Sequence, residues 1–161
     1  ACLDHVQSLT FTLLEAELEA AEGMLALPDV GADQLIERFC ALQNVRIEAL
    51  MEGDDAGAAA LFTIRHDLPS MTGGDKLGGL SPGSRRMAAC YIQIVMRISG
   101  NTLDLQSAML VSGMIGGQIV NMFLRRNRLA EMGWEITAER IAWLKAAVRK
   151  HTIAILQAYQ P

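Results

Sequence analysis

The amino-acid sequence predicts an all-α fold: a single-domain bundle of five or six helices over residues 1–161, built around a central glycine-containing helix. Apolar residues recur at steps of three and four positions through most of the chain, which is typical of amphipathic helices. One stretch, YIQIVMRI at 91–98, is rich in β-branched residues. It has no second strand candidate to pair with, and an unpaired strand would leave its backbone groups unmatched, so we expect a helix there.

The amino-terminal part of the chain is expected to hold three helices. The first runs to about Leu27, where the turn residues PDVG follow it. Asp33 is a candidate cap for the second helix, with Glu37 in its first turn. A shorter alanine-rich helix is expected over 54–66. The buried face of the second helix is predicted to consist of Ile36, Phe39, Cys40, Gln43, Ile47 and Leu50.

A long glycine-rich loop is expected at about 68–84. Its glycines and Pro69 interrupt regular structure, and a loop of this length within a compact domain is usually functional or disordered. We expect it to contact a partner through apolar side chains that become ordered on binding. The residues of this predicted interaction loop are Lys76, Leu77, Leu80, Arg85 and Arg86.

Three further helices are expected after the loop. Ser81 and Pro82 suit the cap and the first position of a helix that continues over 85–99. A long helix is expected over 103–130, with Gly133 as the left-handed residue after its end. Thr137 is the predicted cap of the last helix. The inner stripe of that helix is predicted to consist of Ile141, Leu144, Val148, Thr152, Ile155 and Tyr159.

The stretch MLVSGMIGGQIVNMF at 109–123 lies inside the long helix and is apolar on nearly every side. Polar residues interrupt it, so we do not expect a membrane span, which needs about 20 predominantly apolar residues. Each glycine costs a helix roughly 1 kcal/mol relative to alanine, and close packing would offset that cost. Gly113, Gly116 and Gly117 therefore predict a tight crossing with the 85–99 helix, a homodimer seam, or a kink that opens a cavity.

A ligand pocket is the alternative use of this helix. Gln118 and Asn121 would be costly to bury without hydrogen-bond partners. They would bond across a seam or line a pocket between helices, which is a common arrangement in bundles. The residues predicted to line such a pocket are Met109, Met114, Gln118, Asn121 and Met122.

No motif in the sequence predicts catalysis, a cofactor or a bound metal. The segment GDKLGGLS has the glycine spacing of a phosphate-binding loop but lacks its lysine, and Cys2 with His5 is one weak metal-like pair. Arginines 125, 126 and 128 form a local basic cluster, and residues 131–150 after it resemble a helix-turn-helix only superficially. A net charge of −4 at pH 7 argues against a nucleic-acid partner. Three cysteines, an odd and low number, favour a reducing compartment, so a cytoplasmic location is expected.

These observations predict a non-catalytic, cytoplasmic and bacterial protein that binds another protein, in regulation or as an adaptor, and that acts as a homodimer. The alternative is a sensor domain that holds a small apolar ligand between its helices. A third hypothesis is an enzyme that uses His66 and two arginines, Arg85 and Arg86, on an anionic substrate. The arginines would stand beside the free N–H groups at a helix start.

Overall fold

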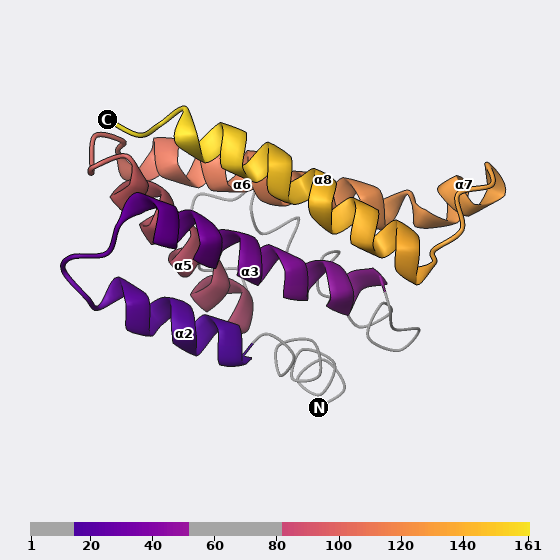
Figure 1. Ribbon diagram of the computed structural model, residues 1–161, viewed down its shortest axis with the longest axis horizontal. Helices are drawn as coiled ribbons and strands as arrows, with labels where there is room; N and C mark the ends of the chain where they lie inside the picture. Colours follow the sequence, from indigo (N-terminus) through magenta and orange to yellow (C-terminus); the bar gives the residue numbers. More distant parts are fainter. Residues whose placement is uncertain (1–14, 52–81) are drawn as a thin grey trace.

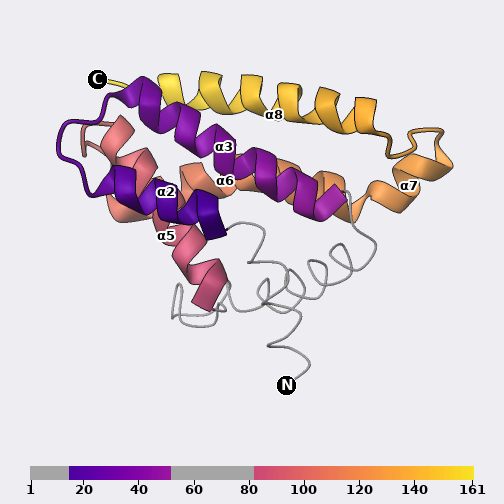
Figure 2. The ribbon, with the colours of Figure 1, turned by 60° about the horizontal axis from the view of Figure 1, so that its bottom comes forward.

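The computed structural model describes residues 15–51 and 82–161, which form a bundle of helices with no strand among them (Figure 1). Helices α3, α6 and α8 lie side by side, α5 crosses α6 obliquely, and α2 packs against α3 and α5 (Figure 2). The predicted all-α class is confirmed. The expected helix at 54–66 and most of the 68–84 loop lie outside the described residues. The helices are α2 (Glu15–Leu25), α3 (Ala32–Met51), α5 (Pro82–Ile98), α6 (Leu105–Leu124), α7 (Arg126–Glu131) and α8 (Ala138–Gln157).

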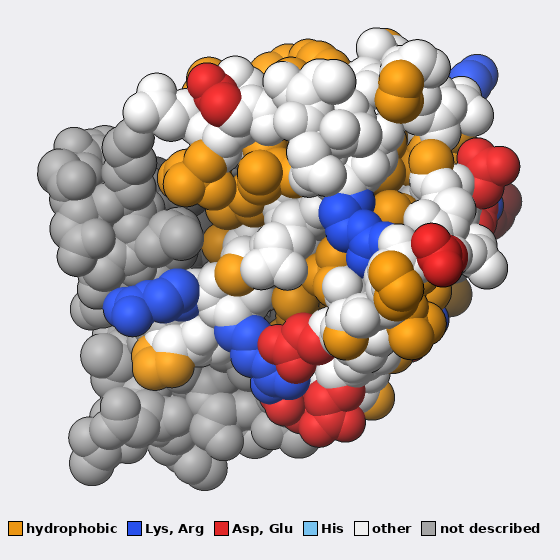
Figure 3. All heavy atoms as spheres, turned by 90° about the vertical axis from the view of Figure 1, so that its left-hand side faces the viewer, with side chains coloured by type: hydrophobic (Ala, Val, Ile, Leu, Met, Phe, Trp, Pro, Cys, Tyr) orange, Lys and Arg blue, Asp and Glu red, His pale blue; other side chains and the backbone are white. Residues whose placement is uncertain are grey.

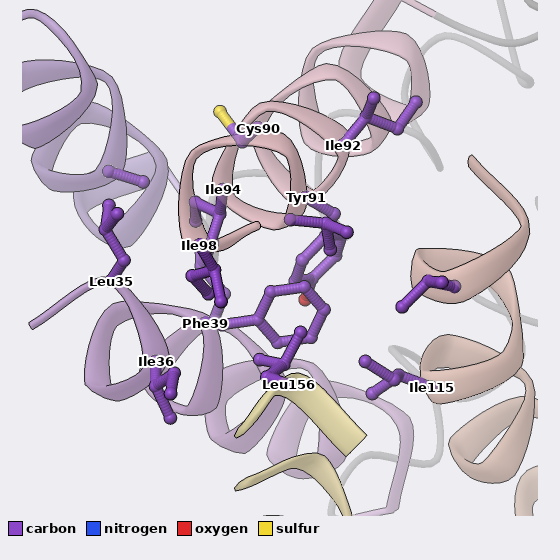
Figure 4. Close-up of a cluster of buried hydrophobic side chains, with 14 of the residues drawn as sticks. Leu35, Ile36, Phe39, Cys90, Tyr91, Ile92, Ile94, Ile98, Ile115 and Leu156 are labelled. Carbon is purple, nitrogen blue, oxygen red and sulfur yellow. The ribbon is translucent and has the colours of Figure 1, made fainter. Parts of the chain in front are cut away.

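Two clusters of buried side chains join the helices. The larger lies between α2, α3, α5, the first half of α6 and the end of α8. Within it the rings of Phe39 and Tyr91 are in contact, with 4.5 Å between their centroids (Figure 4). The smaller cluster surrounds Phe123 and joins the second halves of α3 and α6 to the first half of α8. The six residues predicted for the inner face of α3 are all buried, so that prediction is confirmed.

The start of α3 differs from the prediction. This helix begins at Ala32, so Asp33 lies in its first turn and is not its cap. The backbone N–H of Gly31 instead donates to the side-chain oxygen of Gln34, at 3.2 Å. A side chain three positions into a helix often makes this return bond to the residue before the helix.

A left-handed turn ends α5 and leads into α6. Gly100 has a φ of +61° and Asn101 a φ of +60°. The N–H of Asn101 donates to the Met96 carbonyl at 2.8 Å, which satisfies one of the free carbonyls at the end of the helix. The carboxyl-terminal Pro161 lies against this turn, since a Cβ on Gly100 would be 3.2 Å from its side chain. Chain end and turn therefore meet at one end of the bundle.

The long helix predicted over 103–130 is divided in two. Helix α6 ends at Leu124, and Arg125, with φ −95° and ψ 0°, separates it from α7. The Arg126 guanidinium lies over the Phe123 ring, 4.7 Å from its centroid, and donates to the Leu50 carbonyl of α3 at 3.5 Å. These contacts involve a helix distant in sequence, so local periodicity does not predict the break.

Helix α8 starts as predicted and differs at its end. The Thr137 hydroxyl accepts a hydrogen bond from the Arg140 N–H at 3.3 Å, and Gly133, with a φ of +84°, ends α7 before it. The inner-stripe assignment of Tyr159 is wrong, because this residue lies beyond the end of α8 and is exposed. Ile155 is half-buried and packs against the larger cluster. The buried residues of α8 are Ile141, Leu144, Val148, Thr152 and Leu156.

Arginine side chains attach the short helix α2 to α5. Arg86 makes a two-pronged pair with Glu22, at 2.6 and 2.7 Å, and also donates to Glu15. Arg97 donates to three backbone carbonyls at and after the end of α2, those of residues 25, 27 and 28. Figure 3 views this end of the molecule, where positive and negative side chains lie directly beside one another. The charges here join helices to one another.

Candidate functional site

Helix α6 begins at a side-chain cap and buries one face. The Asp104 carboxylate accepts a hydrogen bond from the Ser107 N–H at 2.7 Å, which satisfies a free donor at the helix start. Buried residues then recur at steps of three and four, the spacing of a single helical face. They are Ala108, Val111, Ile115, Ile119 and Phe123. The central position expected for this helix stays a prediction, since the described helices cover this one face.

The opposite face of α6 is exposed and mostly apolar. The side chains of Leu110, Met114 and Leu124 are 69%, 62% and 50% exposed. The exposed positions 110, 114, 117, 121 and 124 follow alternating steps of four and three residues, which is the spacing of a seam between two helices. Gly113 is exposed beside Met114. We call this surface the α6 stripe, and none of its residues is charged. The α6 stripe consists of Gln106, Leu110, Gly113, Met114, Gly117, Asn121 and Leu124.

The glycines of α6 do not make the expected crossing with the helix at 85–99. A Cβ added at Gly113 or Gly117 would meet no atom of the described residues within 4 Å. That part of the prediction is wrong, because α5 packs against the opposite face of α6, at Ala108, Val111 and Ile115. Gly116 faces the bundle instead, where a Cβ would lie 3.1 Å from Nη1 of Arg46 on α3. A dimer seam at Gly113 and Gly117 stays a prediction.

The residues proposed to line a ligand pocket are not brought together. Met109 packs against the larger cluster, Met122 against the smaller one, and Met114 is exposed. Gln118 lies 3.1 Å from the Nδ1 atom of His151 on α8, and Asn121 accepts a hydrogen bond from Arg125 at 2.9 Å. These five residues therefore do not line one pocket within the described part of the chain, and a ligand pocket stays a prediction. Side chains on an apolar helix point in all directions, and proximity in sequence does not make them converge.

The predicted interaction loop is only partly visible. Lys76, Leu77 and Leu80 lie outside the described residues. Arg85 is an exposed residue of α5. Arg86 is held in the ion pairs with α2, and its hydrogen bonds to the two glutamates raise the pKa of the guanidinium above its ordinary value. Because two carboxylates already neutralise Arg86, the geometry does not favour an anion at this helix start.

Several titratable groups in the described helices are buried or held in ion pairs. Burial raises the pKa of the Cys40 and Cys90 thiols, which makes both poor nucleophiles at neutral pH. A shallow groove of about 390 Å³ lies between α2 and α3. Its charged residues are paired, Arg38 with Glu17 at 2.6 Å and Glu37 with Arg149 at 2.5 Å. Within residues 15–51 and 82–161 no group of three or more potential metal ligands occurs.

Sequence reasoning missed a set of buried polar groups in the core. The Tyr91 hydroxyl, the Gln43 amide and the Thr152 hydroxyl are buried and have no hydrogen-bond partner among the described residues. Burial raises the pKa of Tyr91 to about 12. In Figure 4 the Tyr91 hydroxyl lies among apolar side chains next to Phe39 and Leu156. Residues 43 and 152 fall on predicted inner faces, but apolar periodicity does not reveal whether a polar residue there is bonded.

By length and composition, α6 is the one helix in the described part of the chain that could cross a membrane, with a mean hydropathy of 1.4. Only 28% of that apolar window is buried, which agrees with the exposure of the α6 stripe. Comparisons with protein-family models, with curated proteins and with solved structures find no match to this chain. The functional argument is therefore made from the geometry of its own residues.

Proposed function

We propose that this chain is a non-catalytic protein-interaction protein, regulatory or adaptor in role, that acts as a homodimer through the α6 stripe. The observation that carries the proposal is the row of exposed apolar side chains on α6, spaced for contact with a second helix. Exposed apolar residues scattered singly are ordinary on protein surfaces, whereas a contiguous apolar row marks an interaction site.

The energetics of the α6 stripe support association. Full burial of a Leu or Met side chain contributes roughly 1.5–3 kcal/mol, and a symmetric dimer would bury Leu110, Met114 and Leu124 from each copy. Two helical glycines cost α6 roughly 1 kcal/mol each relative to alanine. With no atom of the described chain over Gly113 and Gly117, a second helix approaching closely would offset that cost.

A cytoplasmic location is part of the proposal. Cys40 and Cys90 are free and buried, which suits a reducing compartment. Some charged residues of the described helices form interhelical ion pairs, such as Lys145 with Glu48 and Arg149 with Glu37. Their side chains serve to join helices, which supports a binding role over a catalytic one.

The test replaces one residue of the α6 stripe and one residue outside it. Met114→Glu places a charge in the proposed seam, while Ala146→Glu adds the same charge at an exposed position of α8. Size-exclusion chromatography with light scattering should give a dimer for the native chain and for Ala146→Glu, and a folded monomer for Met114→Glu. Equal masses for the two variants, with helicity unchanged by circular dichroism, would contradict the proposal.

A small-molecule sensor is the second candidate, and the unbonded core groups are the observation that favours it. Buried polar groups are nearly always hydrogen-bonded. Gln43, Tyr91 and Thr152 have no hydrogen-bond partner within residues 15–51 and 82–161, so they would gain from a ligand that both donates and accepts. Native mass spectrometry of the purified chain would show a retained small molecule under this alternative. A spectrum with only the mass of the polypeptide would reject it.

A further inference from the structure

The two ends of α6 carry opposite charge. Asp104 stands at the amino-terminal end, and Arg125, Arg126 and Arg128 follow the carboxyl-terminal end. Arg125 follows directly on Leu124, the last residue of the α6 stripe, and is exposed. Between these ends, residues 105–124 contain no charged side chain. The relative direction of two paired α6 helices therefore decides which charges meet at the ends of the seam.

We infer that the partner of the α6 stripe is a second copy of the same chain whose α6 runs in the opposite direction. This inference rests on the proposed function. A parallel pair in register would bring Arg125 of one copy beside Arg125 of the other, and like charges at close range are destabilising. An antiparallel pair places each arginine group near Asp104 of the other copy and also opposes the two helix dipoles favourably.

The sizes of the side chains in the α6 stripe fit the antiparallel direction. In a pair centred between Gly113 and Met114, Leu110 of one copy faces Gly117 of the other. Met114 then faces Gly113 in the same way. Each large side chain lies over a glycine, whose missing Cβ leaves the space that a close helix contact requires. A parallel pair in register would instead set leucine against leucine and glycine against glycine.

The polar residues of the stripe fit the same arrangement. With that centre, Gln106 of one copy lies opposite Asn121 of the other. Both side chains are exposed in the single chain. The Asn121 side-chain oxygen accepts from Arg125, and its NH2 group can donate to the side-chain oxygen of Gln106. A two-fold pair contains this contact twice, once at each end of the seam. The pairing is isologous, so the same surface serves both copies and the assembly closes at two.

Cysteine cross-linking tests the direction of pairing. Gln106→Cys and Asn121→Cys are made separately in a Cys2→Ser chain, since Cys40 and Cys90 are buried. In the antiparallel pair each new cysteine lies roughly 22 Å along the helix axis from its own equivalent, too far for a disulfide. We expect each variant alone to give no covalent dimer on oxidation. A mixture of the two variants should give one on non-reducing gels.

The outcomes separate the inference from the proposed function. A covalent dimer of Asn121→Cys alone would overturn the antiparallel direction while leaving the homodimer in place. If light scattering shows a dimer but no sample forms a covalent dimer on oxidation, the α6 stripe is not the interface. A chain that is monomeric would overturn both the direction of pairing and the homodimer. A chain that stays in solution only with detergent would also overturn both, and would show that lipid covers the α6 stripe.

Discussion

At the scale of single residues, the Tyr91 hydroxyl carries a cost that can be measured. The tyrosine is buried, and its hydroxyl has no hydrogen-bond partner among the described residues. An unmatched buried polar group costs roughly 1–3 kcal/mol. We therefore expect Tyr91→Phe to raise the free energy of unfolding, by about 1 kcal/mol, in chemical denaturation at neutral pH.

Tyr91→Ala is the matched control, and loss of its ring contact with Phe39 should lower the free energy of unfolding by about 3 kcal/mol. A loss of stability in Tyr91→Phe would show that the hydroxyl is bonded.

The same residue predicts a dependence on alkaline pH. Burial raises the pKa of Tyr91 to about 12 in the folded chain, from an ordinary value of 10. The folded state thus keeps its proton between pH 10 and 12, where the unfolded state releases it. Stability should fall as pH rises through this window, by up to about 3 kcal/mol. Tyr91→Phe should lack this part of the fall, and identical pH profiles of the two chains from denaturant titrations would contradict the assignment.

At the scale of helices, α2 is joined to α5 by ion pairs that acid should weaken, in addition to its buried Leu18 and Ala21. The hydrogen bond from Arg86 lowers the pKa of Glu22 below its ordinary value of 4.5. The stabilising effect is therefore present above pH 4.5 and is lost as pH falls through the lowered pKa. Because the paired side chains are 33–46% exposed, we expect Arg86→Met to cost no more than about 1 kcal/mol.

Hydrogen exchange resolved by helix would measure this effect. Protection of the α2 amides, corrected for intrinsic rates, should fall at acid pH before that of the α3 amides, whose buried face is larger. In Arg86→Met the protection of α2 should be lower at neutral pH and less sensitive to acid. Equal loss of protection in both helices, in the native chain and the variant, would show that α2 does not open separately.

Gly23 and Gly133 both lie in open surroundings, so substitutions there test the effect of backbone conformation without a change in packing. A Cβ at Gly23 of α2 or at Gly133 after α7 would meet no described atom within 4 Å, but only Gly133 has a positive φ, +84°. Gly23→Ala should raise stability by about 0.5 kcal/mol through helix propensity. Gly133→Ala should lower it by about 1 kcal/mol, because an L side chain disfavours the left-handed region. Thermal melts of the two variants that shift in the same direction would contradict this reasoning.

Local rules predicted the helices well, and contacts distant in sequence account for what was missed. The Thr137 cap and the Gly133 turn depend on neighbouring residues, so the sequence shows them directly. Next to the break at Arg125, Arg126 donates to the Leu50 carbonyl of α3, and Arg86 pairs with Glu15, 71 positions away. Neither contact leaves a local pattern.

At the scale of the whole molecule, local sequence patterns also do not show which side of α6 forms the candidate interaction surface. Helix α6 is apolar nearly all round, so its periodicity could not show which side faces the core. The sequence predicted a glycine seam there, and the packing of α5 on the opposite face decides that Gly113 and Gly117 point outward. The residues named for a pocket lie on different sides of α6. The exposed leucine and methionine side chains of α6 can be recognised only in the assembled bundle, where the opposite face of this helix packs into the core.

The direct test of this account is sedimentation equilibrium of the native chain over a range of concentrations in buffer without detergent. We expect a mass that rises with concentration to twice the 17.5 kDa of one chain and no further. Pairing buries the α6 stripe of both copies, so no third copy can bind there. A mass that stays at 17.5 kDa throughout, or a chain that remains in solution only when detergent is added, would contradict it.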